Sequence, residues 1–420
     1  MEEAKTMAKA RSKPTNRGLS AAKAARRDEF YTQYIDIQKE VEAYLEYDPD
    51  TFRNKVVYCN CDDPFESNFF KYFATNFNRL GLKKLVTTSY DGSPIAGAQL
   101  SFLEYNEGNG KRQKPKAISV EIEEVKDING DGATDIEDVK IFLEQTPHKR
   151  PPLAEGGDFR SPECISRLKE ADIVATNPPF SLFREYVAQL VEHGKKFLII
   201  GPKNAITYKE IFPLIKDTEL WLGTGFANGN AYFSIPAEGH REFAAGVYDK
   251  STGLVKFRNV GWFTNLDHGR RHETLPLMTM QDNLRFSKHK EIKGKKAYAR
   301  YDNYDAIEVP FTDAIPSDYE GVMGVPITFL DKHNPAQFEI LGITKTWFGG
   351  ACKTYPKQIQ VGKDGRESVV TKLNDGPSLK VEKAPVGRTH YKVANELFIQ
   401  RYARILIRHR RARATKGTKK

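Results

Sequence analysis

The first half of the chain contains a strand, an amphipathic helix and a second strand in succession. The apolar run Lys55-Val-Val-Tyr-Cys59 predicts a short buried strand, and Asn60-Cys-Asp-Asp-Pro64 has the composition of a turn that begins a helix. Phenylalanines then recur every four residues from position 65 to 77, which is the spacing of one helix face, and Gly81 is a helix stop. Lys84-Leu-Val-Thr-Thr-Ser89 predicts the next strand. Two strands joined through a helix are expected to run parallel.

A second unit of the same kind lies further along the chain. Ala171-Asp-Ile-Val-Ala-Thr176 predicts a buried strand, the residues from Ser181 to about His193 have one apolar helix face, and Lys196-Phe-Leu-Ile-Ile200 predicts another strand. Strands that alternate with helices are typical of a mostly parallel sheet. We therefore predict an α/β fold, with a Rossmann-like sheet covered by helices on both faces.

Composition divides the chain further. Residues 91–157 are polar and rich in Gly and Pro, and we interpret them as insertions into the loops of the sheet. Beyond about residue 265 the predicted strands become shorter, and a Lys-rich stretch covers residues 288–296. We predict a first domain over residues 28–265 and a second, α+β domain over residues 266–400.

The basic residues are concentrated at the two ends of the chain. Residues 1–27 hold four Lys and four Arg against two Glu, and residues 401–420 hold six Arg and three Lys with no acid. Because the net charge of all 420 residues is only +10, the stretch between these ends is mildly acidic. Clustered terminal charge indicates a polyanionic partner such as nucleic acid, or else a tail that only solubilises the chain. We predict that residues 1–27 form a disordered basic leader.

Composition also excludes several classes of protein. A hydrophobic content of 39%, with 25 Phe and 19 Tyr, favours a folded core over disorder. The apolar runs are too short for a transmembrane helix, and the first residues lack the apolar segment of a secretory signal. Four scattered cysteines do not form a disulfide framework. We predict a cytoplasmic protein with no membrane partner.

The sharpest chemical signal is Asn177-Pro178-Pro179-Phe180, which follows a predicted strand. Ligands of open α/β sheets bind outside the carboxyl ends of the strands, where this loop falls. Two prolines stiffen the loop and remove two amide donors, so it offers carbonyl oxygens together with the Asn177 amide, and Phe180 supplies a stacking face. Such a loop suits an exocyclic amino group on a flat heterocycle. The alternative is a Pro-Pro turn in which Asn177 caps the helix.

These residues resemble the catalytic motif of S-adenosylmethionine-dependent amino methyltransferases, which act on adenine N6, cytosine N4 or protein glutamine. Further blocks narrow the resemblance to the EcoRI-type adenine-specific DNA modification methylases. The blocks cover residues 28–34, 56–64, 67–73, 177–183, 301–307 and 321–330. Residues 401–408 resemble the final strand of that family. The resemblance does not extend to the leader, to residues 91–157 or to much of residues 341–395.

The resemblance implies a mechanism for the Asn-Pro-Pro-Phe loop. Asn177 and the carbonyl of Pro178 would accept hydrogen bonds from the adenine amine, Pro179 would keep the loop rigid, and Phe180 would stack on a flipped base. Catalysis would rest on positioning and electrostatics rather than on a strong base. It also implies that residues 28–265 form a methyltransferase catalytic domain, that residues 266–400 recognise the target, and that residues 401–420 form a final strand and basic tail.

The resemblance further implies contacts with the cofactor S-adenosylmethionine. Phe30-Tyr31-Thr32 resembles the N-terminal cofactor motif of these enzymes, and Gly157-Asp158-Phe159 resembles the acidic turn that reads the adenine amine of the cofactor. The loop after the first strand usually carries Gly-x-Gly, whereas here it is Cys59-Asn60-Cys61-Asp62-Asp63. We still expect Cys59, Asn60 and Asp62 to contact the cofactor. The alternative for the two cysteines is packing at the strand end, and a single Cys-x-Cys pair is weak support for a metal.

A separate pattern within residues 91–157 matches a calcium loop of the EF-hand type. Oxygen-bearing side chains occupy positions 1, 3, 5, 9 and 12 of the loop, Gly132 is at position 6, and an apolar helix follows. The predicted ligands are Asp127, Asn129, Asp131, Ala133, Asp135 and Asp138. The pattern also resembles a single dockerin repeat. The alternative is an acidic surface loop with an Asp-Gly turn.

The leading hypothesis is a site-specific DNA methyltransferase of a bacterial cell that methylates the N6 amine of adenine in double-stranded DNA by base flipping. A protein glutamine N5-methyltransferase would share the Asn-Pro-Pro-aromatic loop but would need neither basic tails nor a large second domain. A calcium-dependent interaction module built around residues 127–138 is the third hypothesis. The recognised DNA sequence, a cognate restriction endonuclease acting separately, and a phage origin are left open by the sequence.

Overall fold

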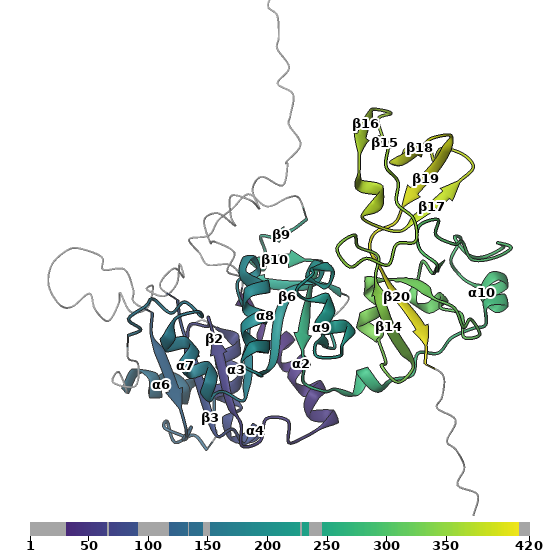
Figure 1. Cartoon of the computed structure of the whole chain (residues 1–420). Coiled ribbons are helices and arrows are strands. Elements are labelled where there is room, and N and C mark those ends of the chain that lie inside the picture. Colours follow the sequence, from purple (N-terminus) through teal and green to yellow (C-terminus); the bar gives the residue numbers. More distant parts are fainter. Residues whose placement is uncertain are drawn as a thin grey trace, which may run out of the picture.

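The computed structural model describes residues 31–64, 67–90, 117–132, 134–145, 152–226, 229–234 and 246–410 (Figure 1). The predicted leader, Phe30, residues 91–116 of the predicted insertions, Ala133 and residues 411–420 lie outside the described residues. The fold is mixed α/β with several β-sheets, as the alternation of strands and helices indicated.

A seven-stranded sheet forms the centre of the larger body (Figure 1). Its strands in spatial order are β4 (Ser119–Ile122), β3 (Lys84–Thr88), β2 (Val56–Asn60), β5 (Ile173–Thr176), β6 (Lys196–Pro202), β11 (Val260–Thr264) and β7 (Trp221–Leu222). The four strands predicted from the apolar runs, β3, β2, β5 and β6, are parallel to one another. The added strands β4 and β11 pair antiparallel with β3 and β6, and β7 pairs antiparallel with β11.

Helices cover both faces of this sheet. One face is covered by α2 (Tyr34–Tyr47), α3 (Asn68–Thr75), α4 (Phe77–Leu80) and α6 (Ile136–Gln145), and the other by α7 (Pro162–Glu170), α8 (Phe183–Glu192) and α9 (Phe212–Lys216). Alternate residues of β2 belong to the two cores: Val57 and Cys59 pack with the first group of helices, whereas Val56 and Tyr58 pack with the second. This alternation follows from the two-residue period of a strand.

The phenylalanine-rich stretch forms two helices rather than the single predicted helix. α3 ends and α4 begins at Asn76, whose side-chain amide donates to the carbonyl oxygen of Tyr72 and to the hydroxyl of Tyr34. Local bonds of this kind compete with the backbone ladder of a helix, which explains the break. Gly81 takes the left-handed conformation with φ of 62° and ends α4, as predicted.

A small antiparallel sheet stands beside the larger one. Its strands in spatial order are β1 (Tyr31–Thr32), β8 (Ala231–Ser234), β10 (Leu254–Phe257) and β9 (Tyr248–Asp249). Because β1 pairs with β8, the first described residues are connected to a segment that lies two hundred positions later in the chain, where Thr32 pairs with Phe233.

The C-terminal part contains two further sheets. Helix α10 (Met280–Phe286) precedes a four-stranded sheet of β12 (Ile307–Glu308), β13 (Met323–Pro326), β20 (Arg404–His409) and β14 (Phe338–Ile343). A five-stranded sheet, β16 (Glu367–Val370), β15 (Gln358–Val361), β18 (His390–Val393), β19 (Glu396–Gln400) and β17 (Ser378–Val381), lies between β14 and β20 in the chain. The final strand expected over residues 401–408 is thus β20, paired with both β13 and β14.

Short 3-10 helices connect several of these elements. They are η2 (Phe180–Leu182), η3 (Lys203–Thr207), η6 (Gly269–His272), η7 (Thr312–Ala314), η8 (Ile327–Lys332) and η9 (Lys372–Asn374). No helix in the described part of the chain is long and apolar enough to span a membrane.

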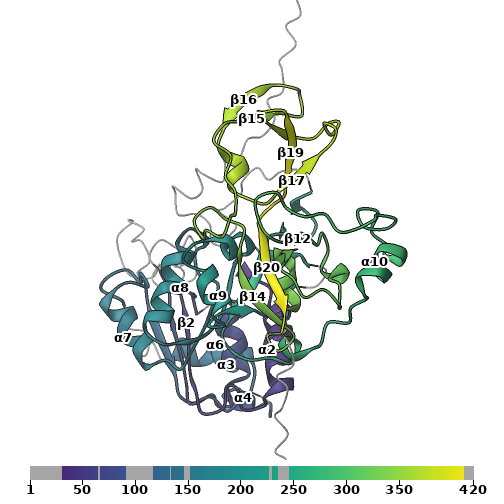
Figure 2. The same cartoon turned by 45° about the vertical axis from the view of Figure 1, so that its right-hand side comes forward.

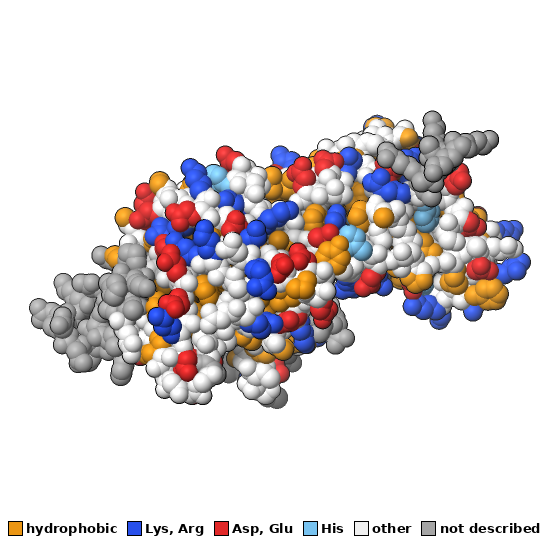
Figure 3. Space-filling model, turned by 90° about the horizontal axis from the view of Figure 1, so that it is seen from below, with side chains coloured by type: hydrophobic (Ala, Val, Ile, Leu, Met, Phe, Trp, Pro, Cys, Tyr) orange, Lys and Arg blue, Asp and Glu red, His pale blue; other side chains and the backbone are white. Residues whose placement is uncertain are grey.

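The two parts of the chain share one hydrophobic core. Phe212 of α9 makes edge contacts with Trp347 and Phe348 of the C-terminal part, and the Lys203 ammonium lies 2.8 Å from the Asp331 carboxylate. In Figures 1 and 2 the five-stranded sheet stands at the top of the molecule. The parallel strands run upward in the same view, because α4, which precedes β3, lies at the bottom. On the lower face, Lys and Arg side chains are interspersed with Asp and Glu (Figure 3).

Candidate active site

The predicted site segments meet where the strand order reverses. The chain runs outward from β2 through β3 and β4 on one side, and from β5 to β6 on the other. The carboxyl ends of strands at such a reversal form the crevice in which open α/β sheets bind ligands. β2 ends at Asn60 and β5 at Thr176, and the Thr176 hydroxyl donates a hydrogen bond to the carbonyl oxygen of Asn60. The loop after β2 and the Asn-Pro-Pro-Phe loop therefore start side by side.

The Asn177–Phe180 loop is held by the elements on either side of it. Pro178 is buried, and Asn177, Pro179 and Phe180 are half-buried. The amide of Leu182 donates to the carbonyl oxygen of Pro179 at 3.0 Å, which forms the turn of η2 ahead of α8. Phe180 packs against the core on the α3 face of the sheet. The loop is thus short, supported at both ends, and partly open.

Asp62 is the most unusual side chain of the site. It is only 7% exposed; its Oδ1 accepts a hydrogen bond of 2.5 Å from the Ser67 hydroxyl, whereas its Oδ2 is buried without a hydrogen-bond partner among the described residues. Burial raises the pKa of the Asp62 carboxyl to about 7. The backbone of Asp62 is fixed to β3, because its amide donates to the Thr88 carbonyl at 3.0 Å and its carbonyl accepts from the Thr87 hydroxyl at 2.5 Å.

The chain turns sharply before Asp62 without the usual glycines. Cys61 has a φ of 63°, a left-handed conformation that glycine normally takes, so its backbone makes the turn in spite of its side chain. Cys59 is fully buried in β2, and burial raises the pKa of its thiol. The Asn60 side-chain oxygen accepts a hydrogen bond of 3.0 Å from the Thr88 hydroxyl. Asp62 is therefore the predicted residue of this loop that retains an unused buried acceptor.

Thr32 lies next to the same loop. Its carbonyl oxygen accepts a hydrogen bond of 2.7 Å from the Asn68 side chain at the start of α3, directly after Ser67. The Thr32 side chain is buried, and its hydroxyl oxygen has no partner in the part of the chain that the structure describes. The predicted motif at residues 30–32 thus reaches the N-terminal end of α3, although Phe30 itself lies outside the described residues.

The turn at Gly157–Phe159 packs on the end of β3. Gly157 has a φ of 71°, and a Cβ atom there would lie 1.8 Å from the carbonyl oxygen of Ser89, so only glycine allows this close approach. Both carboxylate oxygens of Asp158 accept hydrogen bonds from the Arg160 guanidinium, at 2.9 and 2.7 Å. Phe159 is buried and makes an edge contact with Tyr186, with ring centres 5.0 Å apart.

Sequence reasoning missed several side chains that shape this edge. Ser67 has two roles. Its hydroxyl donates a hydrogen bond to Asp62, and the same oxygen caps α3 by accepting hydrogen bonds from the amides of Phe69 and Phe70. Tyr186 of α8 is fully buried, and its hydroxyl has no hydrogen-bond partner within the described ranges. A serine two residues before Phe69 was a readable cap signal. The apolar spacing of α8 predicts that Tyr186 is buried, but its proximity to the Asp62 loop depends on tertiary packing, which no local pattern encodes.

The predicted calcium loop forms a compact turn ahead of α6. The Asp127 carboxylate accepts hydrogen bonds from the amides of Gly130, Asp131 and Gly132, at 2.7, 3.2 and 2.8 Å. Asp138 is buried and accepts from the amides of Ile128, Asn129 and Asp135. Within the residues that the structure describes, no group of three or more His, Cys, Asp or Glu side chains is arranged to hold a metal ion. Calcium binding has no support here.

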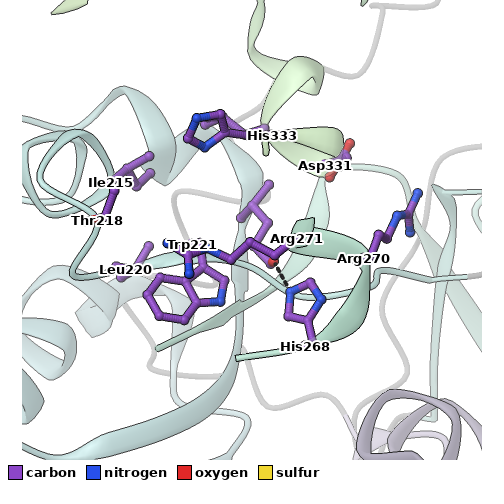
Figure 4. A pocket seen from close by; sticks show the side chains of 11 residues that line it. Ile215, Thr218, Leu220, Trp221, His268, Arg270, Arg271, Asp331 and His333 are labelled. Carbon is purple, nitrogen blue, oxygen red and sulfur yellow. Dashed lines mark hydrogen bonds between the residues drawn. The ribbon is translucent and has the colours of Figure 1, made fainter. Parts of the chain in front are cut away.

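A separate hollow lies at the other edge of the central sheet (Figure 4). Its lining includes Trp221, His268, Arg270, Arg271, Asp331 and His333. The Arg271 guanidinium lies 3.8 Å from the ring centre of Trp221. Trp221 pairs with Thr264, the last residue of β11. Because β11 is antiparallel to β6, this end of β11 lies beside the start of β6. The hollow is therefore at the amino ends of the parallel strands, away from the Asn177–Phe180 loop.

The fold and the site together define a class of enzyme. A mixed α/β fold with an Asn-Pro-Pro-Phe loop at the end of one of its parallel strands is consistent with a methyltransferase. Residues 18–410 match the family model described as adenine-specific methyltransferase EcoRI, and the chain belongs to this family.

Curated relatives agree with this assignment. The type II methyltransferase M.EcoRI of Escherichia coli is 44% identical over 340 residues, which cover 79% of this chain and 90% of the relative. M.MpnI of Mycoplasma pneumoniae is 36% identical over 333 residues, covering 77% of this chain and 84% of the relative. M.MgeORF184P of Mycoplasma genitalium is 35% identical over 326 residues, with coverage of 77% and 85%. No solved structure matches the chain significantly.

Proposed function

We propose that this protein transfers a methyl group from S-adenosylmethionine to the N6 amine of an adenine in a defined sequence of double-stranded DNA. The observation that carries the proposal is the strand reversal between β2 and β5, which puts the Asn177–Phe180 loop beside the Asp62 loop. The first loop offers acceptors for an amine, and the second is lined by unused buried polar atoms.

Each residue of the Asn177–Phe180 loop has a defined task in this proposal. The side-chain oxygen of Asn177 and the carbonyl oxygen of Pro178 accept hydrogen bonds from the two N–H groups of the adenine amine. These bonds orient the lone pair of the amine nitrogen. Phe180, supported from behind by the core, stacks on the base after it leaves the double helix. Methyl transfer makes the nitrogen acidic, so its proton leaves afterwards without a strong base. The loop therefore acts by positioning and electrostatics.

The residues around Asp62 fit the cofactor. Three buried polar atoms are without hydrogen-bond partners among the described residues: the Thr32 hydroxyl, Asp62 Oδ2 and the Tyr186 hydroxyl. Buried polar groups are rarely left unpaired, so an unpartnered carboxylate oxygen in the loop at the strand reversal indicates a site for a polar ligand. S-adenosylmethionine, when bound, supplies the electrophilic methyl group. Thr32 and Asp62 would hold the cofactor. Asp158 would accept a hydrogen bond from the adenine amine of the cofactor while its carboxylate also stays paired with Arg160.

The C-terminal part is proposed to recognise the DNA. The five-stranded sheet stands on the side of the molecule toward which the parallel strands of the central sheet run (Figures 1 and 2). Residues 345–403, which contain it, hold eight Lys and three Arg against two Asp and three Glu. A basic module on the side of the active site suits the phosphate backbone. The lower face in Figure 3, where the two signs of charge are mixed, lacks this character.

The other hypotheses gain no support from the relatives. None of the three is described as a glutamine methyltransferase or a calcium-dependent module. We propose no function for the predicted calcium site. A cytoplasmic location in a bacterial cell and a separate cognate endonuclease stay predictions.

A direct experiment tests the proposed function. Purified protein is incubated with S-adenosylmethionine and a library of duplex DNA, and modified adenines are located by sequencing. We expect N6-methyladenine within one sequence motif. A methyl group recovered only on protein glutamine, or adenine methylation with no sequence preference, would overturn the corresponding part of the proposal.

A further inference from the structure

A Lys-rich stretch after α10 has no part in the proposed chemistry. Residues 285–296, which we call the basic segment, hold five Lys and one Arg against one acid, Glu291, so their net charge is +5 with His289 neutral. Lys288 pairs with Asp313 at 2.8 Å. The other five cations are exposed and form no ion pair with any described residue: Arg285, Lys290, Lys293, Lys295 and Lys296.

The basic segment is folded onto the protein and is not a loose loop. Ile292 is only 3% exposed and belongs to the large core, and the amide of Gly294 donates to the carbonyl oxygen of Leu284 in α10 at 2.8 Å. The His289 ring stacks on Phe311, with ring centres 3.7 Å apart. The backbone that carries the five cations is therefore held in place before any partner binds, which lowers the entropy lost on binding.

The charge of the basic segment fits a polyanion. Like charges held on one short segment repel one another, and no carboxylate in the described part of the chain pairs with the five cations to relieve this repulsion. Double-stranded DNA carries one negative charge per about 1.7 Å of helix axis, so it offers several phosphates to a segment of this size. Lysine ammonium groups bind phosphates as point charges and read no base in doing so.

The position of the basic segment excludes a contact with the target adenine itself. In Figures 1 and 2, α10 stands on the side of the C-terminal part that faces away from the central sheet. The C-terminal part thus lies between the basic segment and the Asn177–Phe180 loop. A duplex that contacts both has to continue past the C-terminal part, beyond the sequence that is recognised.

We propose that the basic segment binds the sugar-phosphate backbone of DNA that flanks the recognised sequence on one side. This inference rests on the proposed function, because it takes double-stranded DNA as the partner from there. It adds a contact that is indifferent to sequence, so the segment strengthens binding to long DNA without changing which adenine is methylated. Because the chain has one such segment and one active site, the flank is used on a single side of the target adenine.

Fluorescence anisotropy of the full chain with three labelled duplexes tests the proposal. One duplex contains little more than the recognised sequence, and the other two are extended by about 15 base pairs, roughly 50 Å of helix, on one side or on the other. Affinities are measured over a range of salt concentrations. We expect the wild-type protein to bind one of the extended duplexes more tightly, with a slope of log affinity against log salt that is steeper by roughly 0.9 for each added phosphate contact.

Two triple variants connect this gain to the charge of the basic segment. Replacing Lys290, Lys293 and Lys296 with Ala should reduce the slope on the preferred extended duplex by up to about 2.7 and weaken binding to it roughly tenfold or more. Replacing the same three residues with Arg keeps the charge and should retain the wild-type slope. The short duplex does not reach the segment, so both variants should bind it with wild-type affinity.

A third triple variant is the matched control. Lys55, Lys83 and Lys169 are also exposed, and they lie near the amino ends of β2, β3 and β5, away from the proposed DNA path. Replacing these three with Ala removes the same charge from the protein. It should leave the slope and the affinity unchanged on all three duplexes.

The outcomes separate this inference from the proposed function. A wild-type slope of the Lys290, Lys293 and Lys296 alanine variant on both extended duplexes, or an equal loss on the short duplex, would overturn the inference alone. So would an effect of the three lysines on binding of polyglutamate but not of DNA, which would identify an acidic protein as the partner. Absence of adenine methylation by the wild-type protein would overturn the proposed function, whereas the slope on a long duplex of any sequence still decides whether the basic segment binds DNA.

Discussion

The buried ion pair between Glu308 and Arg404 should be essential for the C-terminal sheets. The Arg404 Nη2 and Nε atoms donate to the two Glu308 oxygens at 2.7 and 3.1 Å, and the Tyr301 hydroxyl donates to the same carboxylate. The side chains are only 4% exposed for Glu308 and 11% for Arg404. The pair joins β12 to β20, the strand that follows the five-stranded sheet.

Glu308→Ala would leave the Arg404 guanidinium buried without its counter-charge. Removing one partner of a buried ion pair typically costs about 3–5 kcal/mol, because the remaining charge stays desolvated. At about 1.4 kcal/mol per tenfold change, amide hydrogen exchange in β13 and β20 should accelerate between roughly a hundredfold and a few thousandfold. Replacing both residues with apolar ones, Glu308→Leu with Arg404→Met, should restore much of the protection. The other partner of Glu308, Arg401 at 3.3 Å, is 32% exposed, so water can solvate its charge when the carboxylate is gone.

The same strand supplies the control. Arg408 of β20 pairs with Glu339 at 3.0 Å, but these side chains are 48% and 40% exposed. An exposed pair contributes about 0–1 kcal/mol, so Glu339→Ala should change exchange less than about tenfold. The reasoning would be refuted if the two alanine variants accelerated exchange equally, or if the double apolar variant were no better than Glu308→Ala.

Three further predictions concern the site and the tails. Phe180→Ala should weaken capture of the target base by roughly 1–3 kcal/mol, visible as a higher KM for DNA, and unchanged KM and kcat would count against its stacking role. Gly157→Ala should lower the melting temperature and the affinity for S-adenosylhomocysteine, because its methyl group would lie 1.8 Å from the Ser89 carbonyl oxygen; wild-type values for both would disprove the close approach. Deleting residues 1–27 and 411–420 should reduce the slope of log affinity against log salt by roughly 0.9 per lost phosphate contact while sequence preference survives, and an unaltered slope would show that the tails are only solvated charge.

The boundary of that last deletion shows what the structure adds to sequence. The residue pattern favoured a tail beginning near His409, but His409 is the last residue of β20 and the amide of Arg410 donates to the carbonyl oxygen of Gln337. Strand ends are set by pairing with distant segments, here β14, and a basic composition hides this.

The central strands were predictable, and the Asn177–Phe180 loop could be chosen as a candidate site, because these signals are local. Apolar runs next to turn residues defined β2, β3, β5 and β6, and the Asn177–Phe180 motif is contiguous. The antiparallel strand β11 between β6 and β7 was not predicted, since its place in the sheet depends on pairing across sixty residues, Gly261 with Gly201. Nothing local marked Glu40 as buried either, yet it accepts hydrogen bonds from the Thr224 amide and hydroxyl.

The candidate site residues also differ in whether a local sequence signal or the tertiary surroundings mark them. Asn177 and Phe180 followed from the motif, whereas the exceptional position of Asp62 follows from its surroundings. Ser67 occupies one of its oxygens, and burial surrounds the other, and both facts need coordinates. Asp158 illustrates the converse, because the residue expected from sequence to read the adenine amine of the cofactor is paired with Arg160.

The most direct test of the account is the rate of adenine methylation by the Asn177→Ala variant. Methyl transfer to a duplex that contains the recognised sequence is measured for wild type and variant at saturating cofactor, with S-adenosylhomocysteine affinity and melting temperature as checks of the fold. Loss of one positioned acceptor should lower kcat by roughly 10²-fold to 10³-fold and leave both checks unchanged, as for other groups that act only in the transition state. A variant that methylates adenine at the wild-type rate would contradict the assignment of this loop as the catalytic centre.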